Sequence, residues 1–285
     1  MSKLKIAVQK KGRLNEDSLE LLKACGLAIE NGKDQLKVTV RNFPVEILYL
    51  RNGDIPQYLE DGTVDIAIIG ENNIVEKQKN IQIIDRLGFS KCKVSLAVPK
   101  ETVYRGLSFF NGKKIATSYP VTLQKYLNEN NIIAEIHNIS GSVEIAPNIG
   151  LADGICDIVS SGSTLFKNGL KEIDVIMTSE AVLASSPNLS EAKQDILNKL
   201  LFRIKSVQKA KNNKYILMNV PNNKVKAVSD LLPVMKSPTV LPLAEQDWSS
   251  LHSVIQEDQF WKVIDELKQA GAEDILIIPI DKMVN

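Results

Sequence analysis

Residues 61–70 read DGTVDIAIIG, and residues 153–162 read DGICDIVSSG. Both stretches place Asp-Gly before a second aspartate, Asp65 or Asp157, and continue through a strand-like run to a glycine. A nearly uninterrupted apolar run is typical of a strand that helices cover on both faces. The similarity predicts two related α/β lobes, with Asp65 and Asp157 in matching places.

The residues around these stretches alternate between strand and helix patterns. In the first lobe we expect strands at Leu4–Gln9 and Val45–Leu50, and a helix at Glu16–Ala24 that is followed by Gly26, as helix C-termini often are. In the second lobe we expect strands at 94–98, 114–116, 132–138 and 155–160, and helices at 122–129 and 144–151. This alternation favours a mainly parallel sheet, with ligands bound beyond the carboxyl ends of the strands.

The last residues follow a different pattern. Strands are expected at 215–220, 239–243, 249–255 and 275–280, and helices at 222–232 and 258–270. The order βαββαβ is that of a ferredoxin-like domain. The polar stretch Lys209–Lys214 is the expected linker to it.

Composition excludes several classes of protein. The 285 residues carry 35 Lys and Arg against 34 Asp and Glu, so the net charge is only +1, and the basic residues are scattered rather than clustered as a nucleic-acid surface requires. No stretch approaches the roughly 20 apolar residues of a membrane helix, and no signal peptide is visible at the N-terminus. Three isolated cysteines and two histidines argue against a zinc site and suit a reducing cytoplasm.

The strongest local signal is DIVSSGSTL at 157–165. A buried strand ends there in a turn that precedes a short helical stretch, an arrangement in which backbone N–H groups bind phosphate. The hydroxyls would add donors, and glycine would let the backbone approach closely. The residues of this candidate loop are Ser160, Ser161, Gly162, Ser163 and Thr164. The alternative is a plain Ser/Gly turn that caps a helix.

Other polar residues follow the ends of expected strands. Lys10 and Arg13 lie in the turn after the first strand, and Arg51 follows the strand at 45–50. They suit an anionic substrate in a cleft, but a solvated basic turn explains them equally well. Glu71 and Asn72 follow the glycine at 70, where they could contact a purine or cap a helix.

Carboxylates and a second small turn complete the candidate set in the second lobe. Asp153 and Asp157 are candidates for binding sugar hydroxyls or a magnesium–diphosphate, although Asp65 suggests that such an aspartate belongs to the architecture of a lobe. Ser142 and Glu144 lie in another polar turn after a strand. No nucleophile with an adjacent base is visible, which favours group transfer between two bound anionic substrates.

At this point the chain resembles the ATP phosphoribosyltransferase family of histidine biosynthesis, in its long form. The resemblance is carried by AVQKKGRL, DGTVDIAIIGEN, KKIATSYP, SGSVEIAP, GLADGICDIVSSGSTLFKNGLKEI, VLPLAEQDWSS and ILIIPIDKM, in the order of the family and over essentially the whole chain. It implies transfer of phosphoribosyl from 5-phosphoribosyl 1-diphosphate to N1 of ATP with release of diphosphate, and a requirement for Mg²⁺, whose ligands it leaves unassigned. The competing interpretation is a non-enzymatic solute-binding module with a similar cleft.

The resemblance also implies a fold and a division of the chain. The fold is α/β, with a two-lobe periplasmic-binding-protein-like catalytic core and a C-terminal ferredoxin-like βαββαβ domain. Residues 1–90 with 182–208 would form catalytic lobe one, 91–181 lobe two, and 211–285 the regulatory domain. The protein would be a cytoplasmic homo-oligomer, with dimers assembling into hexamers.

Roles for particular residues follow from the same resemblance. Lys10 and Arg13 would be catalytic, and the loop at 160–164 would hold the 5-phosphate of phosphoribosyl diphosphate, with Asp153 and Asp157 nearby. Histidine would inhibit through the C-terminal domain, where His252 and Asp247 are candidate contacts only from their place in that domain. The nucleotide side would consist of Arg51, Glu71, Asn72, Ser142 and Glu144.

Overall fold

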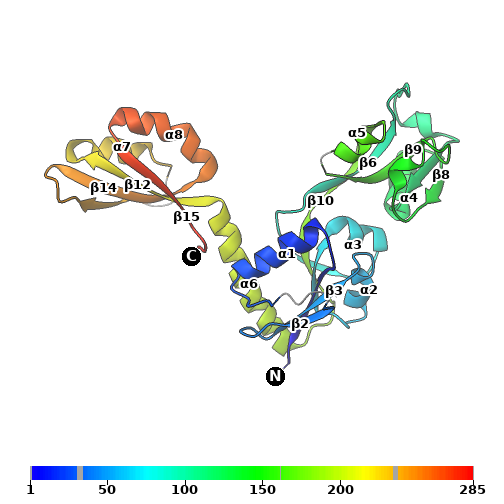
Figure 1. Cartoon of the computed structure of the whole chain (residues 1–285), viewed down its shortest axis with the longest axis horizontal. Helices are drawn as coiled ribbons and strands as arrows, with labels where there is room; N and C mark the ends of the chain where they lie inside the picture. The colour runs from blue at the N-terminus through cyan, green and yellow to red at the C-terminus, as the bar shows by residue number, and fades with distance from the viewer. Residues whose placement is uncertain (1, 31–34, 161, 234–236, 285) are drawn as a thin grey trace. The chain divides into compact units, whose positions relative to one another are not determined.

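The computed structural model describes residues 2–30, 35–160, 162–233 and 237–284 (Figure 1). The chain divides into two compact units, Met1–Lys23 with Leu27–Ile196, and Ala24–Gly26 with Leu197–Asn285. The first unit contains two α/β lobes, each built on its own sheet. The predicted fold class is confirmed.

Lobe one is built on a six-stranded sheet in the order β2-β3-β1-β4-β11-β5. The central strands β1, β3 and β4 run parallel. The sequence patterns did not reveal β2, which is antiparallel to β3, or β11, which is antiparallel to both β4 and β5. The strands are β1 (Leu4–Gln9), β2 (Lys37–Thr39), β3 (Val45–Leu50), β4 (Ile66–Gly70), β5 (Gln82–Arg86) and β11 (Ala181–Ser185), and the helices are α1 (Arg13–Ala24), α2 (Ile55–Glu60) and α3 (Glu71–Lys77).

Lobe two is built on a five-stranded sheet in the order β10-β6-β9-β7-β8, in which β9, β7 and β8 are parallel. Its strands are β6 (Cys92–Pro99), β7 (Lys114–Thr117), β8 (Glu135–Asn138), β9 (Gly154–Val159) and β10 (Leu170–Ser179), and its helices are η1 (Leu107–Phe110), α4 (Pro120–Glu129), η2 (Val143–Ile145) and α5 (Ser163–Lys167). The chain passes between the lobes twice, before β6 and after β10.

The second unit contains most of α6 (Glu191–Lys211) and a four-stranded antiparallel sheet in the order β13-β14-β12-β15. The elements are β12 (Asn213–Pro221), η3 (Asn222–Lys224), α7 (Val225–Leu231), β13 (Thr239–Pro242), β14 (Trp248–Gln256), α8 (Glu257–Ala270) and β15 (Glu273–Pro279). Counted within the domain, this is the order 4-1-3-2 of a ferredoxin-like sheet. Buried side chains such as Ile216, Met218 and Leu267 form its core.

Two local expectations were wrong. Lys209–Lys214 is no linker, because α6 continues to Lys211 and β12 begins at Asn213. The helix expected at 144–151 is only the single turn η2, because Pro147 cannot donate an N–H and Gly150 has a φ of +72°. The domain limits stay predictions, and the second unit begins at Leu197, inside α6 rather than at residue 211.

Residues 61–70 and 153–162 do form related strands in the two lobes, but the structurally equivalent positions differ from those that the sequence repeat predicts. β1 pairs Ile6 with Ile66, whereas β7 pairs Ile115 with Gly154, so the residue before each strand is Asp65 in lobe one and Asp153 in lobe two. Asp65 Oδ2 accepts the N–H of Lys5 at 2.8 Å, and Asp153 Oδ2 accepts the N–H of Lys114 at 2.9 Å. Asp65 therefore matches Asp153, and Asp157 has no architectural counterpart.

Candidate active site

The predicted basic residues of lobe one lie at one edge of its sheet. β1 and β3 are in register from Leu4 with Val45 to Gln9 with Leu50, so Lys10 and Arg51 follow neighbouring strand ends, and the N–H of Lys10 donates to Leu50 O at 2.8 Å. Both side chains are exposed. Arg13 begins α1 beside them, and its side chain is 76% exposed, with Nε 3.9 Å from Asp17. Three cations thus extend from one sheet edge.

The loop after β9 lies at the corresponding edge of lobe two. Gly162 has a φ of +73°, in the left-handed region that favours glycine, and no atom lies within 4 Å of the position that a Cβ would take. Ser160, Ser163 and Thr164 are exposed. Ser161, the fifth predicted member, lies outside the described residues.

Asp157 lies on β9, near the loop, and is half-buried. Burial raises the pKa of its carboxyl group, and the charge of Glu144 raises it further, although the N–H of Ile158 donates to Oδ1 at 2.8 Å and opposes the shift. Burial and the charge of Asp157 also raise the pKa of Tyr119. Asp157 thus interacts electrostatically with both Glu144 and Tyr119. A group of titratable side chains with shifted pKa values is typical of functional sites.

Glu144 and Ser142 belong to this neighbourhood rather than to lobe one. Glu144 lies on η2, which packs against β9 through Val143, and Ser142 precedes it with a φ of +50° and an exposed side chain. Sequence reasoning assigned both to the nucleotide side together with Arg51. The structure separates them from Arg51, which is on the other lobe.

Asp153 lies at the amino end of β9, whereas the loop follows its carboxyl end. Six residues of strand separate the two, about 20 Å of extended chain. Besides the N–H of Lys114, its carboxylate contacts Lys113 Nζ at 3.0 Å. Asp153 therefore has a structural role and does not lie with the loop.

A pocket of about 410 Å³ joins the loop to residues of lobe one. Ser160 lines the pocket from the loop, and Glu71 and Arg86 line it from lobe one. The other lining residues lie at or next to the two chain segments that connect the lobes: Lys91, Cys92, Lys93, Thr178, Ser179 and Glu180. Lysine, arginine and hydroxyl groups in one pocket suit a phosphorylated ligand.

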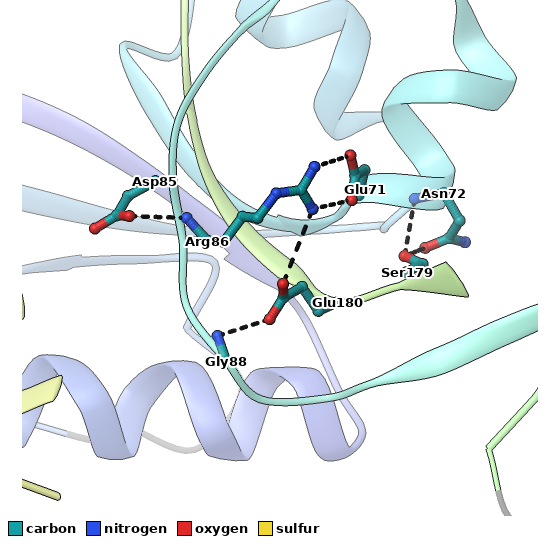
Figure 2. A network of polar contacts seen from close by, with 7 residues as sticks. All are labelled: Glu71, Asn72, Asp85, Arg86, Gly88, Ser179 and Glu180. Atoms are coloured by element: carbon teal, nitrogen blue, oxygen red, sulfur yellow. Dashed lines mark hydrogen bonds and ion pairs between the residues drawn. The ribbon is translucent and has the colours of Figure 1, made fainter. Parts of the chain in front are cut away.

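Sequence reasoning missed Arg86, which organises this pocket. Figure 2 shows its guanidinium held by Glu71, with Nη2 at 2.6 Å from Oε1 and Nη1 on Oε2, and Nη1 3.9 Å from Glu180. Glu180 also accepts the N–H of Gly88 at 3.0 Å. Glu71 is thus already paired in the structure, so a purine would compete with Arg86 for it.

Asn72 is 3% exposed and turned into the protein. Its Oδ1 accepts the hydroxyl of Ser179 at 2.9 Å, its N–H donates to the same hydroxyl at 3.0 Å, and its Nδ2 donates to Tyr119 OH at 3.2 Å. Figure 2 shows the pairing with Ser179. These contacts place Asn72 in a connection between the lobes and not at an open nucleotide surface.

The cysteines pack as expected from their spacing. Cys25 and Cys156 are buried and Cys92 is half-buried. Burial raises the pKa of Cys25 to about 11 and that of Cys156 to about 12, so both remain thiols at neutral pH. Cys92 lines the pocket, but burial raises its pKa too, and the hydrogen bond with Ser179, which acts in the opposite direction, does not offset this.

The two candidate inhibitor contacts lie on the C-terminal sheet domain. His252 on β14 bonds through Nδ1 to Tyr215 OH at 2.8 Å and through Nε2 to Ser250 Oγ at 2.9 Å. Asp247 precedes β14 with a φ of +67° and is exposed. His252 is therefore held by side chains of its own sheet.

The chain matches known families over most of its length. Residues 51–206 match the family model for ATP phosphoribosyltransferase, and residues 210–282 match the model of the C-terminal domain of that family. The ATP phosphoribosyltransferase of Cytophaga hutchinsonii is 56% identical over 99% of this chain and 98% of that protein, and the one of Phocaeicola vulgatus is 53% identical over 99% of each. In the ATP phosphoribosyl transferase (HisG:HisZ) complex from Thermotoga maritima, one chain has 28% identity and a TM-score of 0.62, covering 71% of this chain and 96% of that one.

The two lobes, each with its own sheet, and the pocket that both of them line define a periplasmic-binding-protein-like α/β core with a small-molecule site. In this protein the core has pentosyltransferase activity. The chain belongs to the ATP phosphoribosyltransferase family, in its long form with a C-terminal domain. It transfers phosphoribosyl to ATP in the first step of histidine biosynthesis, and the solute-binding alternative does not hold.

Proposed function

We propose that the loop at 160–164 holds the 5-phosphate of 5-phosphoribosyl 1-diphosphate. The observation that carries the proposal is the left-handed Gly162 at the end of β9, with open space around it and exposed hydroxyls on both sides. An open, glycine-centred turn lets a phosphate approach the backbone, and the hydroxyls of Ser160, Ser163 and Thr164 add donors. Asp157 would then bind the ribose hydroxyls beside the loop.

ATP is proposed to bind at the cationic edge of lobe one. Lys10, Arg13 and Arg51 lie at neighbouring strand ends there and carry the charges that a triphosphate requires. Adenine N1 carries no proton in neutral ATP, so its attack on C1 of the ribose needs no general base. The work of the protein is to align the two substrates and to stabilise the departing diphosphate, for which Lys10 and Arg13 are the proposed cations.

Magnesium is proposed to bind with phosphoribosyl diphosphate. The described residues contain no group of three or more His, Cys, Asp or Glu side chains that could enclose a metal ion. Mg²⁺ usually combines one or two carboxylates with substrate phosphates and water, and Asp157 with its neighbour Glu144 fits that pattern. When bound, the ion would neutralise the charge of the diphosphate.

The assignment of the reaction is tested by mixing the full chain with ATP, phosphoribosyl diphosphate and Mg²⁺. The expected result is an absorbance change from the N1-substituted adenine, with one diphosphate released for each product. Ligand binding without product at any magnesium concentration would contradict the assignment.

Histidine is proposed to inhibit the enzyme through the C-terminal domain, and the protein to assemble into dimers and hexamers. Support for assembly comes from the edge strand β15, on which Leu276 (54%) and Ile278 (45%), two residues apart, expose apolar side chains. Exposed apolar patches mark protein–protein contacts. Within the described residues no helix is both long and apolar enough to span a bilayer.

We propose the cytoplasm as the location of the protein, because a biosynthetic enzyme that uses ATP meets its substrate there.

Removal of residues 212–285 is expected to abolish inhibition by histidine while the two lobes remain folded. The truncation leaves α6 intact and removes the whole C-terminal sheet domain, which has its own core. Transfer rates with and without histidine are compared in the truncated and full chains, with circular dichroism as the control for folding. Inhibition that persists in the truncated chain would place the histidine site on the lobes.

A further inference from the structure

A buried carboxylate of lobe one contacts the start of a helix in lobe two. Glu76 lies on α3 and is only 7% exposed. Its Oε1 accepts the N–H of Val121 at 3.0 Å, and its Oε2 accepts the N–H of Thr122 at 2.9 Å and the hydroxyl of Thr122 at 2.8 Å. All three bonds join the two lobes.

These bonds replace a cap that α4 otherwise lacks. The first N–H groups of a helix have no partner within it and are normally capped by the side chain of the N-cap residue. Here the N-cap residue, Tyr119, makes no side-chain capping bond, and Pro120 has no N–H. Lobe one therefore supplies the cap of a lobe-two helix.

A second residue on the same side of α3 strengthens the connection. Asn72 precedes Glu76 by four residues, so the two side chains lie on one face of the helix. Asn72 donates to Tyr119 OH, directly before the segment that Glu76 caps, and is itself fixed by Ser179 at the end of β10. The face formed by Asn72 and Glu76 thus docks on residues 119–122, beside the chain crossing that follows β10.

We infer that Glu76 is a positioning residue for the transfer reaction. It acts through α4 by fixing the orientation of lobe two relative to lobe one, so that the loop at 160–164 presents phosphoribosyl diphosphate to the ATP on the edge formed by Lys10 and Arg51. The inference rests on the proposed placement of the two substrates on separate lobes. A small error in alignment lowers the rate of a bimolecular transfer strongly while each substrate keeps its own contacts.

The test compares Glu76→Gln with wild type in the full chain. Glutamine has nearly the same volume, but it turns one acceptor oxygen into an NH₂ donor that faces other donors. The expected result is a fall in kcat of about 10-fold or more, with KM for each substrate within about 3-fold. Hydrogen exchange of the amides at 121 and 122 is expected to become faster, whereas exchange in β7 and β9 stays unchanged.

Two further variants separate positioning from folding. Thr122→Val removes one bond to Glu76 without changing the volume and is expected to give a smaller fall in kcat of the same kind. Glu60→Gln is the matched control, because Glu60 accepts the N–H of Asn80 at 3.2 Å inside lobe one, and its kcat is expected to stay at the wild-type value.

Three results would overturn the inference: an unchanged kcat in Glu76→Gln, unchanged exchange at 121 and 122, or a rise in KM for one substrate alone. If Glu76→Gln does not fold, a wild-type kcat in Thr122→Val would overturn it instead. Failure of the phosphate-loop proposal would look different, because Gly162 variants would then keep wild-type binding of phosphoribosyl diphosphate while the amide exchange at 121 and 122 still responded to Glu76→Gln.

Discussion

Replacing Gly162 by valine is expected to lower kcat/KM for phosphoribosyl diphosphate by about 100-fold or more, because the oriented donors of a loop of this kind contribute that much. The effect arises from the backbone. Gly162 has a φ of +73°, which a β-branched residue adopts only with strain, whereas a side chain there would meet no neighbouring atom within 4 Å. The loop must change conformation to relieve the strain, so the phosphate site is lost while ATP binding stays at its wild-type affinity. Steady-state kinetics and calorimetric titration with each substrate provide the measurement.

Gly112→Val is the control for strain alone. Gly112 has a φ of +72° and equally open surroundings, but it lies before β7, at the opposite end of the lobe-two sheet from the loop. It is expected to lose stability and to keep the wild-type KM. Thr164→Ala, which removes one donor hydroxyl, is expected to raise KM for phosphoribosyl diphosphate by about 10-fold. Unchanged binding of phosphoribosyl diphosphate in a folded Gly162→Val variant would contradict the loop assignment, whereas equal loss of both substrates would mean that the variant is misfolded.

Asp157→Asn is expected to lower kcat/KM by about 100-fold without lowering the melting temperature, since truncating a charged group that contacts a substrate costs about that much. Burial raises the pKa of Asp157 in the folded protein. A raised pKa means that the ionised form is less favourable in the folded than in the unfolded state, so stability is lost as the pH rises through that pKa. At neutral pH an amide therefore fits this place at least as well as the carboxylate.

Asp153→Asn is the matched variant with the opposite expected result. Its pKa is lowered, chiefly by the N–H of Lys114 and by Lys113, so the carboxylate stabilises the fold above its unfolded pKa and loses that effect as the pH falls through the folded one. We expect a loss of about 1 kcal/mol, because the group is partly exposed, and an unchanged KM. Thermal melts and kinetics of both variants provide the measurement, and an activity loss in Asp153→Asn with unchanged stability would reverse the two roles.

Much of the fold could be predicted because its elements have clear local sequence patterns. The parallel strands β1, β3, β4, β7 and β9 and the βαββαβ domain follow from apolar runs and turn residues. The loop at 160–164 was visible for the same reason, as a Ser/Gly turn after a buried strand. Local patterns could not give the register of the strands. The sequence repeat predicts that Asp157 is equivalent to Asp65, whereas the strand pairing shows that Asp153 is the equivalent residue.

The rest of the site depends on contacts between residues distant in sequence. Asn72 looked like a cleft residue because it follows a strand, but Ser179, 107 residues later, fixes it inside the protein. Arg86 lies at the end of a short edge strand that carries no strong pattern, and only the fold brings Glu71 to it. The role of Glu76 could not be predicted from the sequence, because a residue that caps a helix of another lobe stands at no fixed distance in sequence from that helix.

A crystal structure of the full chain with phosphoribosyl diphosphate and Mg²⁺ tests the central claim most directly. The account predicts the 5-phosphate within hydrogen-bonding distance of the backbone at Gly162 and of the Thr164 hydroxyl, with the ribose beside Asp157. A 5-phosphate bound instead at Lys10 and Arg13, with the loop at 160–164 in contact with solvent only, would contradict it.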